Sequence, residues 1–180
     1  MILKNRLGLG VLALGFTVAS CDQPATEPQF DHATAHASYA QVSAGELSGL
    51  AKTVRQVTAR FNSTTQAIQA GYVADPVCVA VPGLGGMGFH WVNGGLVDPV
   101  FDALKPEVVL YEQTKNGQYR LVAVEYIVID VGQPAPTFDG QPFDVGGTPV
   151  PVPHWSLHVW AHKENPAGLF VPFNPSVVCN

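Results

Sequence analysis

The sequence predicts an α+β fold in which an N-terminal helical segment packs on an antiparallel β-sheet with long loops rich in proline and glycine. Apolar residues recur every three or four positions before residue 62, which is the period of an amphipathic helix. After residue 72 the apolar stretches are short and rich in β-branched and aromatic residues, which favours strands. The 18 glycines and 15 prolines indicate many turns between them.

Size and charge exclude several classes of protein. The 180 residues suffice for one domain, since domains of about 100–150 residues are the commonest size. With 47% hydrophobic and 13% charged residues, the chain does not have the composition of a disordered protein. Nine basic residues against 14 acidic ones give a formal charge of −5, so nucleic acid is not an expected partner.

Residues 1–21 resemble the signal peptide of a bacterial lipoprotein. Lys4 and Arg6 form a positively charged start, and residues 7–18 form an apolar stretch. That stretch is too short to span a bilayer core of about 30 Å as a helix. It leads into the sequence VASC, which looks like a lipobox. We therefore expect Cys21 to carry the lipid as the first residue of the mature chain.

The mature protein is expected in the bacterial cell envelope, held at a membrane by acylated Cys21 and facing the periplasm or the exterior. Loss of Lys4 and Arg6 leaves seven basic residues against 14 acidic ones, a charge of −7. The acyl chains must therefore supply the membrane affinity without polybasic attraction. Asp22 resembles an inner-membrane retention signal of enteric bacteria, but the choice between inner and outer membrane stays open.

The two remaining cysteines, Cys78 and Cys179, are expected to form a disulfide. An even pair in an oxidising compartment is typical of a structural bridge, here closing a loop of about a hundred residues. The alternative is a redox or metal-binding pair. No C-x-x-C spacing supports that alternative.

The chain beyond the signal peptide divides into a flexible linker over 22–42 and a single globular domain over 43–180. The linker mixes proline, alanine, threonine, aspartate and histidine without apolar periodicity. Ser43 and Glu46 have the spacing of a capping box, which predicts the start of a helix. The apolar period then predicts an amphipathic helix over 44–61, followed by a second short helix.

Strands are expected in the second half of the domain. Two β-branched and aromatic stretches, 107–113 and 119–130, flank an Asn-Gly pair at 116–117 and predict an antiparallel hairpin. The proline-rich segment 132–153 is expected to be a long loop that covers a site. Strict alternation of apolar and polar residues then predicts a strand over 154–162.

Three side chains that can bind metal stand out against apolar surroundings. His90 follows a glycine-rich approach, and Glu125 lies in an apolar strand, where a carboxylate is costly to bury unless it is paired or bound to an ion. In the last strand, histidines four residues apart lie about 13 Å from one another, so His154, His158 and His162 cannot share one ion. Central His158 is the candidate. His90, Glu125 and His158 together would form a site for zinc, copper or iron.

Each of these residues also has an interpretation without metal. The two histidines can be hydrogen-bonded structural residues, and Glu125 can face water or pair with Arg120 or Lys115. If the metal site forms, neighbouring polar side chains are expected to orient its ligands. The candidates for this supporting role are Glu112, Tyr111 and His154.

Three functions follow from these residues. The favoured one is a lipid-anchored envelope protein that binds a divalent metal ion or a small ligand beneath the proline-rich loop. The second is a metal-dependent, hydrolase-like enzyme in which an ion activates water and Glu125 or Glu112 is the base. The third is a structural or interaction lipoprotein without metal. Whether the protein is an enzyme stays open, and with no G-x-S-x-G motif no catalytic residue is assigned.

Four segments resemble, in this order, a family of bacterial secreted proteins and lipoproteins: GYVADPVCVAVPGLGGMGFHWVN, PEVVLYE, LVAVEYIV and LHVWAHKENPAGLFVPFNPSVVC. The resemblance spans residues 50–179. A histidine before LVAVEYIV and a Trp/His segment after it are also similar to the plant oil-body-associated protein family. Neither resemblance implies a catalytic residue. Both place His90, Glu125 and His158 within the recognisable segments.

Overall fold

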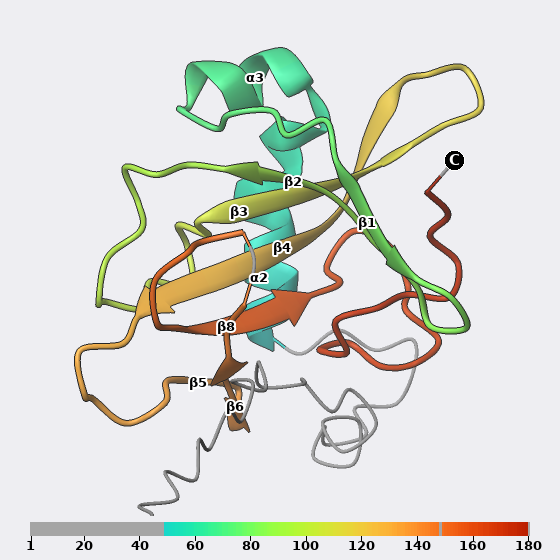
Figure 1. The fold of residues 1–180 in the computed structure, drawn as a ribbon. Coiled ribbons are helices and arrows are strands. Elements are labelled where there is room, and N and C mark those ends of the chain that lie inside the picture. Colours follow the sequence, from blue (N-terminus) through green and yellow to red (C-terminus); the bar gives the residue numbers. More distant parts are fainter. Residues whose placement is uncertain (1–48, 148, 180) are drawn as a thin grey trace, which may run out of the picture. The chain divides into compact units, whose positions relative to one another are not determined.

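Figure 1 shows the fold of the computed structural model, which describes residues 49–147 and 149–179. The predicted signal peptide with Cys21, the linker and the capping box at Ser43 lie outside these residues. Within this described part, no helix is long and apolar enough to cross a membrane.

The described chain begins in a short helical segment. Helix α2 (Gly49–Thr58) runs directly into a 3-10 helix, η1 (Ala59–Asn62), so the predicted helix tightens in its last turn. Helix α3 (Thr64–Gln69) follows, and the Ser63 side chain accepts a hydrogen bond from the Gln66 amide at its start. The buried face of α2 contains Ala51 and Val54, as the apolar period predicts.

A six-stranded antiparallel sheet forms the rest of the core, in the order β1-β2-β3-β4-β8-β7. A separate two-stranded hairpin pairs β5 with β6. This sheet, the short helices and a disulfide confirm the predicted architecture in outline. The strands are β1 (Cys78–Val81), β2 (Gly85–Val92), β3 (Val108–Gln113), β4 (Tyr119–Ile129), β5 (Thr137–Phe138), β6 (Gln141–Pro142), β7 (Asp144–Val145) and β8 (His154–Val159).

Two expectations about the strands need correction. The predicted loop 132–153 contains three short strands, β5, β6 and β7, and β7 extends the edge of the main sheet. The predicted strand over 154–162 ends earlier, at Val159. The chain leaves the sheet there because the Trp160 amide donates to the Leu169 carbonyl, 3.0 Å away, instead of continuing the ladder.

The sheet is buried on both faces. Helix α2 runs behind β3 and β4 in Figure 1, and its Val54 packs with Val109, Val124 and Val159 in one apolar cluster. The opposite face carries a second apolar cluster that includes Val108, Leu110, Ala123, Ile127, Trp160 and Val177. Strand β4 therefore contributes alternate residues to both clusters, which explains its nearly continuous apolar sequence.

The C-terminal segment, residues 174–179, packs over the second apolar cluster. Cys78 and Cys179 form the predicted disulfide, with a Cα–Cα distance of 5.6 Å. Gly86 and Asn174 exchange two backbone hydrogen bonds of 3.0 and 3.1 Å. These links hold Val177, which is 1% exposed, against the face of the sheet opposite α2.

Candidate metal centre

Strand register brings the three predicted ligands to one face of the sheet. Glu125 of β4 lies directly opposite His158 of β8. On its other side, Glu125 lies opposite Val108 of β3. His90 of β2 lies opposite Leu110, two positions along the same strand β3. All three side chains point to the face covered by the C-terminal segment, and those of His90 and Glu125 meet across the intervening strand.

The three side chains converge closely. His90 Nε2 lies 3.7 Å from Glu125 Oε2, and His158 Nδ1 lies 3.8 Å from Glu125 Oε1. One ligand atom from each residue lies within 4.8 Å of the others. The side chains of His90, Glu125 and His158 are 5%, 2% and 5% exposed, so water does not solvate them freely. The imidazole rings are nearly perpendicular, at 85°.

These separations are too long for hydrogen bonds and suit an ion between the ligands. A direct N–H···O bond needs about 2.7–3.2 Å between heavy atoms. With bonds of about 2.1 Å to zinc, two ligand atoms at a tetrahedral angle lie about 3.4 Å apart, and a wider angle increases this distance to at most about 4.2 Å. The pairs at 3.7 and 3.8 Å fall in this range, and a pair as far apart as 4.8 Å must close slightly around an ion. Glu125 Oε2 and His158 Nε2 are buried without a hydrogen-bond partner among the described residues. A buried group of His90, Glu125 and His158 can therefore hold a metal ion.

Burial sets the protonation of the metal-free site. It lowers the pKa of His90 to about 4. Burial and, to a smaller extent, the neighbouring His90 together lower the pKa of His158 to about 3. Burial also raises the pKa of Glu125 to about 8, assisted by the charge of Glu107 and opposed by a hydrogen bond from Ser156. Neutral imidazole is the form that binds metal. A bound dication reverses the effect of burial on Glu125, because it favours the carboxylate.

Three protein ligands leave coordination positions open, as in metal sites that also hold water or a small molecule. The surroundings are apolar, since Val108, Leu110 and Ala123 flank the ligands on the same face. Val177 from the C-terminal segment and Val150 from the proline-rich segment pack against this cluster. The site is therefore shielded by two loop segments that a disulfide and backbone bonds hold in place.

The structure does not place the predicted supporting residues around the ligands. Tyr111 faces the helices, where its hydroxyl donates to the Phe61 carbonyl at 2.6 Å. A bulge between Leu110 and Tyr111 precedes Glu112, which pairs with other charged groups. His154 Nδ1 lies 2.7 Å from the Val152 carbonyl, one strand length from His158. The partners of Glu112 are Arg120 and Lys163, so Arg120 is not the partner of Glu125.

Two further polar residues bear on the site and were not predicted, whereas His162 lies away from it. Ser156 hydrogen-bonds Glu125 from the neighbouring strand β8. Glu107 is 2% exposed, accepts a 2.9 Å hydrogen bond from the Ile127 amide and acts on Glu125 through its charge. His162 leaves the face of His158 and lies 2.8 Å from the Thr58 hydroxyl. A carboxylate just before an apolar strand was the available signal for Glu107.

Comparison with protein-family models, with curated proteins and with solved structures finds no match to this chain. The functional argument therefore rests on the geometry of the described residues.

Proposed function

We propose that this protein is a lipid-anchored protein of the bacterial cell envelope that binds one divalent transition-metal ion through His90, Glu125 and His158. The observation that carries the proposal is the convergence of three buried ligand atoms within 4.8 Å of one another. Two of these residues retain buried polar atoms without a hydrogen-bond partner among the described residues. Such groups are costly in an apolar environment, and an ion bound by Glu125 compensates its unpartnered oxygen.

The donor set selects the class of metal. Two imidazole nitrogens and one carboxylate oxygen suit zinc, copper(II) and iron(II), whereas calcium and magnesium prefer oxygen ligands alone. The ligand side chains are at most 5% exposed, which favours a retained ion over a site open to a large substrate. The envelope location is supported by the lipobox ending at Cys21 and is compatible with the disulfide between Cys78 and Cys179.

Elemental analysis of the full chain tests the metal. The protein is purified without an affinity tag from an oxidising compartment, together with His90→Gln, Glu125→Gln and His158→Gln. We expect about one equivalent of metal in the parent, as for a mononuclear site, and its loss in each folded variant. His162→Gln is the matched control, because it removes a histidine that contacts Thr58 rather than Glu125. A parent that binds no zinc, copper or iron after supplementation would show the metal proposal to be wrong.

A further inference from the structure

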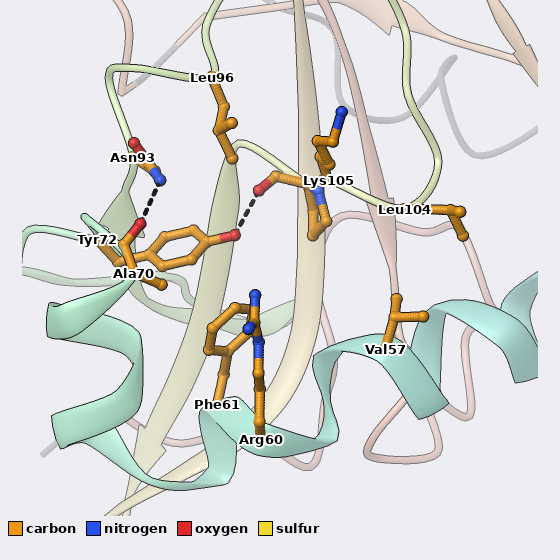
Figure 2. Close-up of a pocket in the computed structure, with 10 residues that line it drawn as sticks. Val57, Arg60, Phe61, Ala70, Tyr72, Asn93, Leu96, Leu104 and Lys105 are labelled. Atoms are coloured by element: carbon orange, nitrogen blue, oxygen red, sulfur yellow. Dashed lines mark hydrogen bonds between the residues drawn. The ribbon is translucent and has the colours of Figure 1, made fainter.

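A second pocket lies on the helical side of the sheet, away from His90, Glu125 and His158. Its volume is ≈ 220 Å³. It lies where η1 meets residues 70–72, which follow α3, and residues 104–106, which precede β3. Phe61, Tyr72 and Leu96 form apolar walls, and Arg60 and Lys105 lie at its edge. Figure 2 shows Arg60 and Phe61 rising from one turn toward the ring of Tyr72. Phe61 and Tyr72 are each only 3% exposed.

The walls of this pocket are held in place by satisfied hydrogen bonds. The Tyr72 hydroxyl donates to the Pro106 carbonyl at 2.6 Å. The Asn93 amide donates to the Ala70 carbonyl at 2.9 Å, and its oxygen accepts from the Gly95 amide. The Phe61 and Tyr72 rings pack edge to face, with centroids 5.0 Å apart. The pocket therefore has rigid apolar walls and is formed before any ligand binds.

Its two cations differ in their partners. Lys105 pairs with Asp102, with 3.0 Å between Nζ and Oδ2. Arg60 has no carboxylate partner among the ion pairs of the described residues, and its guanidinium instead lies 4.6 Å from the centroid of the Phe61 ring. Stacking on an aromatic ring orients the guanidinium and leaves its edge donors for an anion. The pocket thus joins an uncompensated positive charge to apolar walls.

We propose that this pocket binds a small organic carboxylate with an apolar or aromatic body. Arg60 binds the carboxylate, because the planar guanidinium matches its two oxygens. The body of the ligand lies in the pocket against the wall that Phe61, Tyr72 and Leu96 form. The volume of ≈ 220 Å³ is below the range of about 300–1,000 Å³ that is usual for larger ligands, so the ligand has the size of benzoate.

The test uses the full chain and 4-fluorobenzoate, whose binding is followed by ¹⁹F NMR. The neutral alcohol 4-fluorobenzyl alcohol has a similar ring and no negative charge. We expect the carboxylate to bind saturably and more tightly than the alcohol, and Arg60→Gln to raise its Kd by roughly ten- to a hundredfold, as expected for loss of a charge-assisted hydrogen bond. Lys52→Gln is the matched control, because it removes one exposed positive charge from the preceding helix α2, outside the pocket.

Arg60→Lys gives a second readout. It keeps the charge but loses the planar pair of donors, so its Kd is expected between those of the parent and Arg60→Gln. Equal binding of the carboxylate and the alcohol, equal Kd values for the parent and Arg60→Gln, or no saturable binding to the folded parent would each overturn the proposal. Metal content is measured on the same samples, and Arg60→Gln is expected to leave it unchanged, so the two sites are tested separately.

Discussion

Glu125 and His158 face each other as directly paired residues on neighbouring antiparallel strands, with 3.8 Å between Glu125 Oε1 and His158 Nδ1. Both side chains are almost completely buried, and the imidazole of His90 reaches the other carboxylate oxygen from two strands away. Cross-strand neighbours of this kind are positioned by the backbone ladder, so the ligands are held on a rigid element.

The variant Glu125→Gln is expected to weaken metal binding while the fold is retained. The amide has nearly the same shape as the carboxylate but no negative charge for the ion. Since loss of groups that only support a ligand costs about 10–100-fold in affinity, loss of this ligand should cost at least about a hundredfold. Competition with a chromophoric chelator measures the affinity. Glu112→Gln makes the same chemical change at a residue paired with Arg120 and Lys163, and equal losses in both variants would contradict the assigned site.

Acidification is expected to destabilise the protein through His162. Burial, with a smaller effect from Arg55, lowers the pKa of His162 to about 4, below its ordinary value near 6.5. Between these values the unfolded chain binds more protons than the folded one, so stability rises with pH and is lost as the pH falls. The difference in unfolding free energy between parent and His162→Gln should shrink by about 3 kcal/mol from pH 7 to pH 4. Urea unfolding measures this difference, and the same difference at pH 7 and pH 4 would contradict the prediction.

Gly88→Ala is expected to be much more destabilising than Gly83→Ala. Both glycines have positive φ, at 99° and 86°, so both substitutions strain the backbone. A methyl group at Gly88 would also lie 2.4 Å from the Tyr111 carbonyl oxygen, whereas nothing lies within 4 Å of the corresponding position at Gly83. In urea unfolding, Gly88→Ala should lose at least about 1 kcal/mol more unfolding free energy than Gly83→Ala. Equal losses would mean that β2 can move away from β3 at little cost.

Removal of the disulfide is expected to lower stability and loosen the C-terminal segment. The bond joins residues separated by 101 positions, so its loss greatly increases the freedom of the unfolded chain. The double variant Cys78→Ser/Cys179→Ser should lose about 2–4 kcal/mol in urea unfolding. Hydrogen exchange should rise at the amides of Asn174 and Val177, which donate to the carbonyls of Gly86 and Asn174 respectively. Unchanged stability and exchange would show that packing alone holds the segment.

Lipid attachment is tested at Cys21. The variant Cys21→Ser lacks the thiol that would carry the lipid, and we expect it to leave the membrane fraction of bacterial cells and to lose incorporation of labelled fatty acid. Cys179→Ser controls for loss of a cysteine elsewhere in the chain. Membrane association that persists in Cys21→Ser, without incorporated lipid, would exclude the proposed anchor.

Much of the local structure follows from the sequence because it depends on neighbouring residues. The three- and four-residue period places Ala51 and Val54 on one buried face of α2, and the Asn-Gly pair joins β3 to β4 as expected. The metal candidates were also predictable, since a carboxylate or imidazole in an apolar strand is costly unless something compensates it. The surroundings of the proposed supporting residues could not be predicted. The bulge after Leu110 and the ion pair between Glu112 and Lys163 depend on distant parts of the chain.

The sequence by itself therefore determined the types of secondary structure, the cysteine pair and the candidate ligands. Only the tertiary structure decided that His90, Glu125 and His158 meet, that Tyr111 faces the helices, and that His162 turns to Thr58 beyond the end of β8. The physical reason is that alternation along a strand is a property of its own residues, whereas register is set by the sum of contacts between strands. The pocket beside Arg60 likewise needed the fold, because its walls come from segments that are far apart in the chain.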